Sequence, residues 1–503
     1  MESYLIGIDG GSTSIKTVLF DQCGKEIASA SNPTMRLESH TPGFETFDVD
    51  RLWASTSASI KSMLAKAAVD PSRIAGIGMC SFGNGLIILD RDGKSIAPGV
   101  FSQDYRANSI VEGYKRKGSF DRINDIIKGT LYAGEPGPIL RWFKDQKPEV
   151  YEKIGGILLF KDYLMYRLTG VFATDANIFG GSAMLDLTTT DYSTELLNLY
   201  GIPEIEPFLP ELATASSQIV GTVTEKAADE TGLNPGTPVV AGMMDVLACL
   251  VGAGATADGI VTAVAGTWCI NETHSTQIIP GASANMPYLT KGEYLNCAFT
   301  GASGSNYEWF CKAMGGEAKY IAEKQGGSYY EVLNDLIASV PIETSKVMYL
   351  PFVAQPSVHP NAKAEFFNID QNTTYAELAY ALAEGVAFMH RYHIRFLRDS
   401  GCKADVVRLT GGIAKSQVWA RIFADIIELP IETVDCNEVG ALGCAITAGV
   451  GTGLYKSYEE AFEQAVKINP PVTSHTENFE LYEKRYQNWS RLIEIMNIYW
   501  NEQ

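Results

Sequence analysis

The residues best suited to chemistry near the start of the chain are DGGST at positions 9–13. They follow a short apolar run at positions 5–8, which predicts a strand with Asp9 at its carboxyl end. We expect Gly10 and Gly11 to bring backbone N–H groups into the open, where they can bind phosphate because no Cβ blocks the approach. An acidic side chain beside a phosphate turn makes sense with a divalent cation between the two. The segment indicates a metal–nucleotide site, with a plain hairpin turn as the alternative.

A second carboxylate, Asp245, follows the apolar run PVVAGMM and should be partly desolvated. Ligands in α/β folds bind at the carboxyl ends of strands. An aspartate in that place can accept the proton of a substrate hydroxyl that attacks a γ-phosphoryl group. The alternative role for Asp245 is to cap the next helix.

Two further turns could hold a nucleotide. Gly266-Thr267 follows the apolar run GIVTAVA, so that a hydroxyl and an amide can meet the terminal phosphates. Gly411-Gly412 follows the strand-like VVRLT and opens a predicted helix, and helix N-termini bind anions. Two glycines also let a flat adenine or its ribose approach the backbone. The alternatives are a β-turn for the first pair and strand–helix punctuation for the second.

Other suggestive patterns are rejected. His390 and His393 stand one helical turn apart, but no third ligand and no H-E-x-x-H motif accompanies them, so we do not expect a metal there. Gly93-Lys94-Ser95 resembles the end of a P-loop, but Ile88 stands where the required glycine would be. No G-x-G-x-x-G predicts a Rossmann dinucleotide site.

The elements that position these residues follow from periodicity. Strand-like runs alternate with amphipathic helices, which predicts an α/β fold. Helices are predicted over 50–68, 138–153, 162–168 and the C-terminus, and a strand over 74–81. A strand–turn–strand plan recurs from position 259, which predicts two related domains, 1–245 and 246–503, joined near the Gly- and Ala-rich stretch 247–257.

Composition excludes several partners. The formal net charge of −19 argues against a nucleic acid and against an anionic membrane, because neither polyanion would be attracted. The nine cysteines form no C-x-x-C and are expected to be reduced thiols of a cytoplasmic protein. The sequence shows no secretory leader pattern and no apolar run of about 18 residues.

Taken in order along the chain, these motifs resemble those of the FGGY carbohydrate kinases, which are sugar kinases of the actin-like ATPase superfamily. The matching segments are IGIDGGSTSIKTVLFD, PGFETFDVDRLW, FSQDYRA, KDYLMYRLTGVFATD, GTPVVAGMMDV, AGTWCI and LTGGIAKSQVWARIFADIIELPI. The resemblance implies two actin-like (ribonuclease H-like) α/β domains with a catalytic cleft between them. It implies that domain 1–245 carries the sugar and the first phosphate motif, that domain 246–503 carries the adenosine of ATP, and that ATP acts with Mg²⁺.

The resemblance also implies a role for each matching residue. Asp245 would be the general base, and Asp9 and Asp245 would hold Mg²⁺ through water. The nucleotide would be bound by Asp9, Gly11, Ser12, Thr13, Lys16, Gly266, Thr267, Gly411, Gly412, Ser416 and Gln417. The sugar would be bound by Ser81, Asn84, Gln103, Asp104, Arg106 and Asp245, with Arg106 bracing its loop.

The side chains of the expected sugar site favour a neutral polyhydroxylated substrate. Ser81, Asn84, Gln103 and Asp104 offer donors and acceptors but no cation for a substrate carboxylate, and Arg106 is expected to brace its loop. A carboxylate at Glu135 would repel an acidic sugar. Asn84 has an alternative role as a turn residue between Gly83 and Gly85. No role is assigned to Thr46.

Within the family, SFGNGLIILD, SQDYRA and GEPGPILRWFKDQKPEVYEKIG most resemble the L-xylulose and 3-keto-L-gulonate kinase branch, which is xylulokinase-like. Glycerol kinases carry Asn-Gln-Arg-Glu where SFGN stands, which argues against glycerol. The expected function is ATP-dependent phosphorylation of a terminal hydroxyl of a ketopentose, L-xylulose. The expected partner is this small-molecule sugar, and the expected oligomeric state is a homodimer. The alternatives are kinases for D-xylulose, D-ribulose, erythritol or 3-keto-L-gulonate, a catalytically dead sugar sensor, and an actin- or chaperone-like nucleotide switch.

Overall fold

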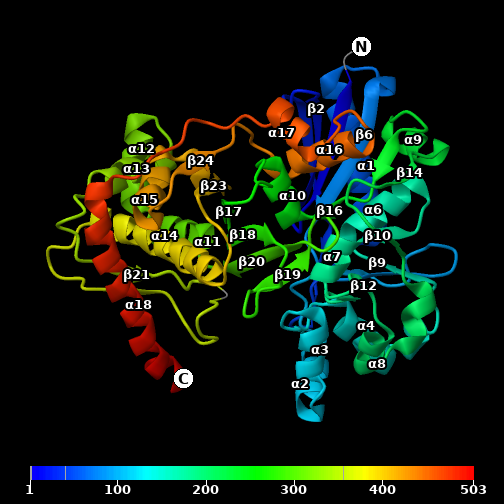
Figure 1. Cartoon of the computed structure of the whole chain (residues 1–503), viewed down its shortest axis with the longest axis horizontal. Helices are drawn as coiled ribbons and strands as arrows, with labels where there is room; N and C mark the ends of the chain where they lie inside the picture. The colour runs from blue at the N-terminus through cyan, green and yellow to red at the C-terminus, as the bar shows by residue number, and fades with distance from the viewer. Residues whose placement is uncertain (1–2, 40, 355) are drawn as a thin grey trace. The chain divides into compact units, whose positions relative to one another are not determined.

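The computed structural model describes residues 3–39, 41–354 and 356–503. The chain folds into two compact α/β units (Figure 1). Unit 1 contains the chain up to Gly254 together with His274–Asn296 and Cys436–Lys467. Unit 2 contains Ala255–Thr273, Cys297–Asp435 and Ile468–Gln503. Among the described residues, no helix is both long enough and apolar enough to cross a membrane.

The main sheet of unit 1 has the strand order β14-β15-β6-β1-β2-β3, and β16 adds to β6. The bounds are β1 Tyr4–Gly10, β2 Ser14–Asp21, β3 Glu26–Pro33, β6 Ile74–Ser81, β14 Ile219–Thr222, β15 Pro238–Val240 and β16 Met243–Met244. The strand predicted over 74–81 is confirmed as β6. Because β1 and β16 both run parallel to β6, Gly10 and Met244 both pair with Ser81, and the three strands finish at one edge of the sheet.

Two sets of helices cover this sheet. Ile6 and Ile8 of β1 share a core with Leu52 and Ile60 of α1 (Val49–Ala67), the helix predicted over 50–68. The helix α16 (Val439–Gly451) packs on β1 and β6, and α10 (Asp245–Gly252) packs on α16. In Figure 1 the orange helix α16 therefore lies beside the blue strands, although the two are far apart in the sequence.

Glycine makes the contact of α16 with the sheet possible. A Cβ at Gly7 would lie 1.9 Å from the Ala441 carbonyl oxygen, and one at Gly78 would lie 2.1 Å from that of Cys444. Real atoms cannot approach so closely, so any larger residue at either position would push α16 away from the sheet.

The remaining elements of unit 1 surround the sugar-site segments. The helices are α2 Asn108–Lys117, α3 Phe120–Ile127, α4 Pro136–Gln146, α5 Pro148–Tyr151, α6 Phe160–Thr169, α7 Ala176–Gly181, α8 Thr194–Tyr200, α9 Glu225–Thr231 and α17 Tyr458–Ala465. Short strands form the groups β4-β5-β8 (Arg36–Leu37, Thr46–Phe47, Gly99–Val100), β7-β9 (Ile87–Leu89, Gly156–Leu158), β10-β13 (Ala173–Asp175, Glu211–Ala213) and β11-β12 (Leu185–Asp186, Asp191–Tyr192). The single helix predicted over 138–153 is wrong, because Pro148 cannot continue α4 and instead starts α5.

The sheet of unit 2 has the order β20-β18-β17-β23-β24. Its strands are β17 Ile260–Ala265, β18 Cys269–Ser275, β20 Tyr294–Thr300, β23 Val406–Thr410 and β24 Ile431–Thr433; β19 (Ala284–Pro287) belongs to the 274–296 segment. The helices are α11 Gly304–Met314, α12 Gly316–Gln325, α13 Tyr329–Ala338, α14 Tyr375–Asp399, α15 Gln417–Ile427 and α18 Phe479–Asn501, and β21 (Met348–Leu350) pairs with β22 (Glu365–Phe367). As in unit 1, the first strand forms a hairpin with the second and pairs in parallel with a later strand.

The boundaries of the two compact units differ from the predicted domain boundary at position 245. The Gly- and Ala-rich stretch expected to join two domains instead begins as helix α10, which belongs to unit 1. Its small residues let α16 approach, since a Cβ at Gly252 would lie 1.9 Å from the Val439 carbonyl oxygen. Segment 436–467 is therefore part of unit 1 despite its place in the sequence. The assignment of sugar binding to 1–245 and of ATP binding to 246–503 stays a prediction.

Candidate active site

Asp9 and Asp245 lie at the edge of the unit 1 sheet where three parallel strands finish. Asp9 is near the end of β1, and Asp245 follows β16 directly as the first residue of α10. This confirms that Asp245 stands at the end of a strand. The capping role is not observed, because Met244 holds the cap position and Asp245 Oδ1 accepts the N–H of Val246 at 2.8 Å.

The two carboxylates influence each other. Burial, and after it the negative charge of Asp9, raise the pKa of Asp245 to about 6. Burial also raises the pKa of Asp9, while the ammonium group of Lys16 acts against this rise. Like charges that share a poorly solvated place are stabilised by a cation or a proton. The pair therefore suits a base that works near neutral pH or a divalent cation held through water.

Lys16 completes the charged surroundings of Asp9. It pairs with Asp9 across the β1–β2 hairpin, and its Nζ lies 2.8 Å from Glu438 Oε2. Glu438 precedes α16, and a Cβ on Gly440 in the first turn of that helix would lie 3.5 Å from Asp9 Oδ2. The positive end of the α16 dipole thus faces Asp9, which favours negative charge there.

The DGGST turn is tighter than the sequence predicts. The Gly11 N–H donates to the Ser14 carbonyl at 3.0 Å, so the expectation that this amide is open is wrong. The Thr34 side chain anchors the turn by donating to the Gly11 carbonyl at 2.7 Å. Ser12 and Thr13 stand at its tip, where Thr13 is exposed. Their contact with phosphate stays a prediction.

Ser81 and Asn84 are both held by neighbours within unit 1. The buried Ser81 hydroxyl donates to the Phe82 carbonyl at 2.9 Å and accepts the Lys161 N–H at 3.2 Å. Asn84 has a φ of 66°, which fits its alternative role in a turn, and its N–H donates to Ser182 Oγ at 2.8 Å. In the described structure, the buried Asn84 Oδ1 has no hydrogen-bond partner. A sugar hydroxyl would satisfy that acceptor.

Asp104 and Arg106 form a buried ion pair, which we call the closed Asp104–Arg106 pair. The buried Asp104 accepts the Glu45 N–H at 2.7 Å and two guanidinium donors of Arg106 at 2.8 and 2.9 Å. The guanidinium also lies 4.4 Å from the ring centre of Phe44 and 5.1 Å from that of Trp142. These contacts fit the bracing role expected of Arg106, which stays a prediction. Contact of Asp104 or of the exposed Gln103 with a sugar stays a prediction.

Glu135 is buried, a feature that the sequence did not reveal. Its side chain is 6% exposed at the start of α4, and its Oε2 accepts the Tyr132 N–H at 3.3 Å. Burial raises the pKa of Glu135 to about 8, so the group is mostly neutral at pH 7. The expectation that it repels an acidic sugar by charge is therefore wrong at neutral pH. Thr46, in β5, pairs with Val100.

Sequence reasoning missed a buried ion cluster behind Ser81. Lys161 Nζ lies 2.5 Å from Asp162 and 2.7 Å from Asp175, and it donates to the Ala241 carbonyl at 2.9 Å. All three charged side chains are at most 1% exposed. The cluster ties α6 and α7 to the turn that leads into β16. The only sequence signal was the presence of charged residues, among them Lys161, Asp162 and Asp175, within the largely apolar segment FKDYLMYRLTGVFATD.

Asn177 was also missed, and it holds the backbone next to Asp245. Its Oδ1 accepts the Met244 N–H at 2.9 Å, and its Nδ2 donates to the Pro287 carbonyl at 2.7 Å. Asp175 caps the helix that carries Asn177 by accepting the Asn177 N–H at 2.9 Å. The residue before the expected base is thus fixed by a buried amide.

Unit 2 brings the two glycine turns together. Because β17 and β23 pair in parallel up to Val264 and Thr410, Gly266 and Gly411 lie side by side. Gly411 has a φ of 91°, and a Cβ there would lie 2.7 Å from the Ala265 carbonyl, so only glycine fits. Among the described residues, apart from the two neighbours of Gly412 in the chain, no heavy atom lies within 4 Å of a Cβ built on it. The space beside this backbone would accommodate a flat ligand, and its contact with adenosine stays a prediction.

The residues after the second glycine pair form a turn before the helix. A 3₁₀ turn (η3, Ile413–Lys415) separates Gly412 from α15, so the pair does not open the α-helix directly. Ser416 caps α15 by accepting the Trp419 N–H at 3.4 Å, and the exposed Gln417 is the first residue of the helix. Their contact with the adenosine stays a prediction.

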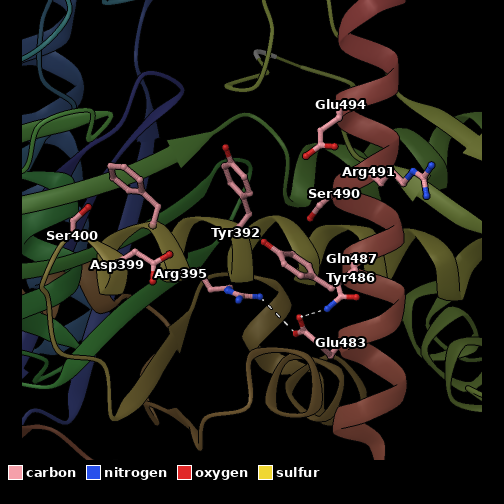
Figure 2. Close-up of a pocket in the computed structure, with 11 residues that line it drawn as sticks. Tyr392, Arg395, Asp399, Ser400, Glu483, Tyr486, Gln487, Ser490, Arg491 and Glu494 are labelled. Atoms are coloured by element: carbon pink, nitrogen blue, oxygen red, sulfur yellow. Dashed lines mark hydrogen bonds and ion pairs between the residues drawn. The ribbon is translucent and has the colours of Figure 1, made fainter.

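A surface hollow elsewhere in unit 2 contains none of the predicted residues. It measures about 710 Å³ and lies between α14 and α18 (Figure 2). In its lining, Glu483 accepts from Gln487 at 3.0 Å and lies 3.6 Å from Arg395. We do not assign this hollow to the active site.

The carboxylate pair of unit 1 and the glycine turns of unit 2 are each features that a nucleotide-dependent phosphotransferase would need. Comparison with known proteins gives the family. Residues 4–252 match the FGGY family of carbohydrate kinases, N-terminal domain, and residues 261–452 match its C-terminal domain. The chain belongs to the FGGY family of carbohydrate kinases and is an ATP-dependent sugar kinase with two domains.

Individual relatives support the same assignment. The chain is 32% identical to the L-xylulose/3-keto-L-gulonate kinase of Escherichia coli (strain K12) over 500 residues, which cover 98% of this chain and 97% of the relative. It is 30% identical to the autoinducer-2 kinase of Yersinia pestis bv. Antiqua (strain Angola) over 497 residues, with coverage of 97% and 93%. Its fold matches the crystal structure of xylulose kinase from Rhodospirillum rubrum with a TM-score of 0.87 and 25% identity, covering 99% of this chain and 100% of that one.

Proposed function

We propose that this sugar kinase phosphorylates a terminal hydroxyl of a neutral ketopentose, and that the ketopentose is L-xylulose. The observation that carries this proposal is the closed Asp104–Arg106 pair. Arg106 is the one cation among the six residues predicted to bind the sugar; its side chain is only 5% exposed, and two of its guanidinium donors bind Asp104. No cation of that set is left to bind the carboxylate of a sugar acid, whereas the unpaired Asn84 Oδ1 suits a hydroxyl.

The similarity to the relative from Escherichia coli supports the choice of sugar. That relative is named for L-xylulose and for 3-keto-L-gulonate. Of these two substrates, the closed Asp104–Arg106 pair favours L-xylulose, which is neutral, over 3-keto-L-gulonate, which carries a carboxylate.

In the proposed mechanism, Asp245 accepts the proton of the attacking hydroxyl. Its pKa of about 6 leaves it mostly ionised at pH 7 but still basic enough to take a proton. Asn177 and the first turn of α10 fix its backbone, so that its carboxylate does not have to be reoriented. Asp9 and Asp245 would hold Mg²⁺ through water, and the dipole of α16 and Lys16 would add positive potential beside them.

ATP with Mg²⁺ supplies the transferable phosphoryl group and neutralises the charge on its oxygens. We propose that Thr267 and the Gly266 backbone contact the terminal phosphates, and that Gly411 and Gly412 contact the adenosine. The exposed Thr267 and the open backbone at Gly412 support these roles. We also propose a cytoplasmic location, which fits nine free cysteines, and a homodimer.

The test is a coupled ADP-release assay with Mg²⁺-ATP and a panel of substrates: L-xylulose, D-xylulose, D-ribulose, erythritol, 3-keto-L-gulonate and autoinducer-2. We expect the highest kcat/KM with L-xylulose. A preference for 3-keto-L-gulonate would contradict the argument from Arg106. A preference for autoinducer-2 would agree with kinase activity but contradict L-xylulose as the substrate. ADP release that no substrate stimulates would contradict sugar kinase activity itself.

A further inference from the structure

The helix α14 carries two buried histidines that the proposed mechanism does not use. His390 is fully buried and His393 is 3% exposed. Both contact Asn271 on β18, the strand that leaves the Gly266–Thr267 turn. Burial lowers the pKa of each histidine to about 3, so both rings are neutral at any pH at which the enzyme would work.

The hydrogen bonds define where each proton is. Asn271 Oδ1 can only accept, so His390 Nδ1 carries a proton and donates to it at 2.8 Å. The other ring nitrogen of His390 is then an acceptor, and the Ser303 hydroxyl donates to it at 3.3 Å. Asn271 Nδ2 donates to His393 Nδ1 at 3.2 Å, which places the proton of His393 on Nε2, where it donates to Ser357 Oγ at 3.4 Å.

Ser303 connects this network to the Gly266–Thr267 turn. It precedes α11, whose first two amides donate to the turn: Gly304 N–H to the Gly266 carbonyl at 2.6 Å, and Ser305 N–H to the Thr267 carbonyl at 3.2 Å. A Cβ at Gly304 would lie 2.3 Å from the Gly266 carbonyl oxygen, so this close approach requires glycine.

The two bonds from α11 set the direction of the turn. In a trans peptide, the C=O and the following N–H point in opposite directions. With the carbonyls of Gly266 and Thr267 directed at α11, the N–H groups of Thr267 and Trp268 are directed away from it. Both residues of these amides, Thr267 and Trp268, are exposed. Backbone amides arranged in this way bind anionic oxygen.

We propose that the network of His390, Asn271 and Ser303 positions the Gly266–Thr267 turn for the β- and γ-phosphates of the nucleotide. The inference rests on the proposed phosphate role of this turn. Asn271 holds β18 on one side of the turn, and Ser303 holds the start of α11 on the other. His390 joins the two through its opposite ring nitrogens, and it acts as a positioning residue that touches no phosphate.

A matched set of variants tests the connection. Ser303→Ala removes the hydroxyl that joins His390 to α11, and Ser303→Thr restores a hydroxyl. His390→Asn keeps a polar group near Asn271 but cannot reach Ser303, and it leaves α11 unchanged. Ser357→Ala is the control, since it removes a hydroxyl from the same network at its His393 end.

The measurement is the Kd for AMP, ADP and the β,γ-imido analogue of ATP, each by calorimetry with the full-length protein, Mg²⁺ and no sugar. In Ser303→Ala and His390→Asn we expect the Kd for ADP and for the analogue to rise about three- to tenfold, as the loss of one hydrogen bond permits. The Kd for AMP should change less than about twofold, because AMP lacks the phosphates that the turn would bind. Ser303→Thr should restore the wild-type values, and Ser357→Ala should keep them.

Three outcomes would overturn the inference. Equal losses for AMP and ADP would show that the network serves general stability. An effect of Ser357→Ala as large as that of Ser303→Ala would remove the connection through α11. Wild-type protein that binds AMP, ADP and the analogue with the same Kd would refute the proposed phosphate role of the turn itself. If thermal unfolding shows that Ser303→Ala does not fold, His390→Asn provides the same test.

Discussion

The carboxylate of Asp9 lies near enough to that of Asp245, within one compact unit, for its charge to add to the burial that raises the pKa of Asp245. The pairing follows from topology, because β1 and β16 both run parallel to β6 and finish at the same edge of the sheet. Each aspartate also has its own support: Lys16 beside Asp9, and the first turn of α10 beside Asp245. The two groups therefore share a local field, while Asp9 accepts from Cys80 Sγ and Asp245 accepts from the Val246 N–H.

Replacing the expected base should stop the chemistry and preserve nucleotide binding. We expect Asp245→Asn to lower kcat by about 10²- to 10⁴-fold, the usual contribution of a general base, with the Kd for ADP unchanged. Asp50→Asn is the control, since Asp50 is an exposed aspartate in the first turn of α1. Turnover of Asp245→Asn within threefold of wild type would remove Asp245 as the base.

The rate should depend on pH through the ionisation of Asp245. A general base works when deprotonated, so kcat/KM should rise with pH through about 6 and level off above it. In Asp9→Asn the midpoint of this rise should move to lower pH, because a negative neighbour that raises the pKa is gone. A pH profile of kcat/KM for both proteins measures the two midpoints, and identical midpoints would contradict the coupling of the two carboxylates.

Asn177 should matter for rate more than for binding. We expect Asn177→Ala to lower kcat about tenfold, because the Met244 N–H loses its acceptor and Asp245 loses its fixed backbone. KM for sugar and for ATP should change little, which steady-state kinetics will show. Asn234→Ala is a matched control, since Asn234 also donates to a proline carbonyl but on the exposed surface. A loss confined to KM would place Asn177 in binding instead.

The buried ion cluster should dominate stability in unit 1. Lys161→Met leaves Asp162 and Asp175 buried without their cation, so we expect the free energy of unfolding to fall by about 3–5 kcal/mol. Lys115→Met, which removes an ion pair whose partners are about half exposed, should cost less than about 1 kcal/mol. Urea unfolding of both variants measures the difference. Similar values for the two would mean that water reaches the cluster.

Asp104 and Arg106 can be separated by kinetics. If Asp104 contacts the sugar, Asp104→Asn should raise KM for the sugar more than KM for ATP, and more than Arg106→Gln does. The reason is that a sugar hydroxyl that loses its partner in the site is left buried and unpaired. Equal effects of the two variants would mean that Asp104 acts only by holding its loop to the Glu45 N–H.

Sequence patterns located the ends of strands better than the contacts between distant side chains. The strand 74–81 and the position of Asp245 were predictable because apolar runs stop where the strands stop. Asn177 could not be found in this way, since its contact with Met244 spans 67 positions and leaves no periodic trace. The same holds for Lys161, whose amide meets Ser81 across 80 positions. The end of helix α4 before Pro148 could have been predicted from the sequence, because proline lacks the N–H that an α-helix needs at that position.

The glycine-lined contact of α16 with β1 and β6 has a consequence for synthesis. The strands of the first sheet leave the ribosome early, but the helix that covers one of their faces follows only after Val439. At about 5–20 residues per second, that face waits roughly 20–70 s for its cover. Nascent chains that stop before Val439 should therefore be cut by protease within β1 and β2 far more readily than chains that extend past Gly451. For that interval, a chaperone or the ribosome surface has to shield what α16 will later bury.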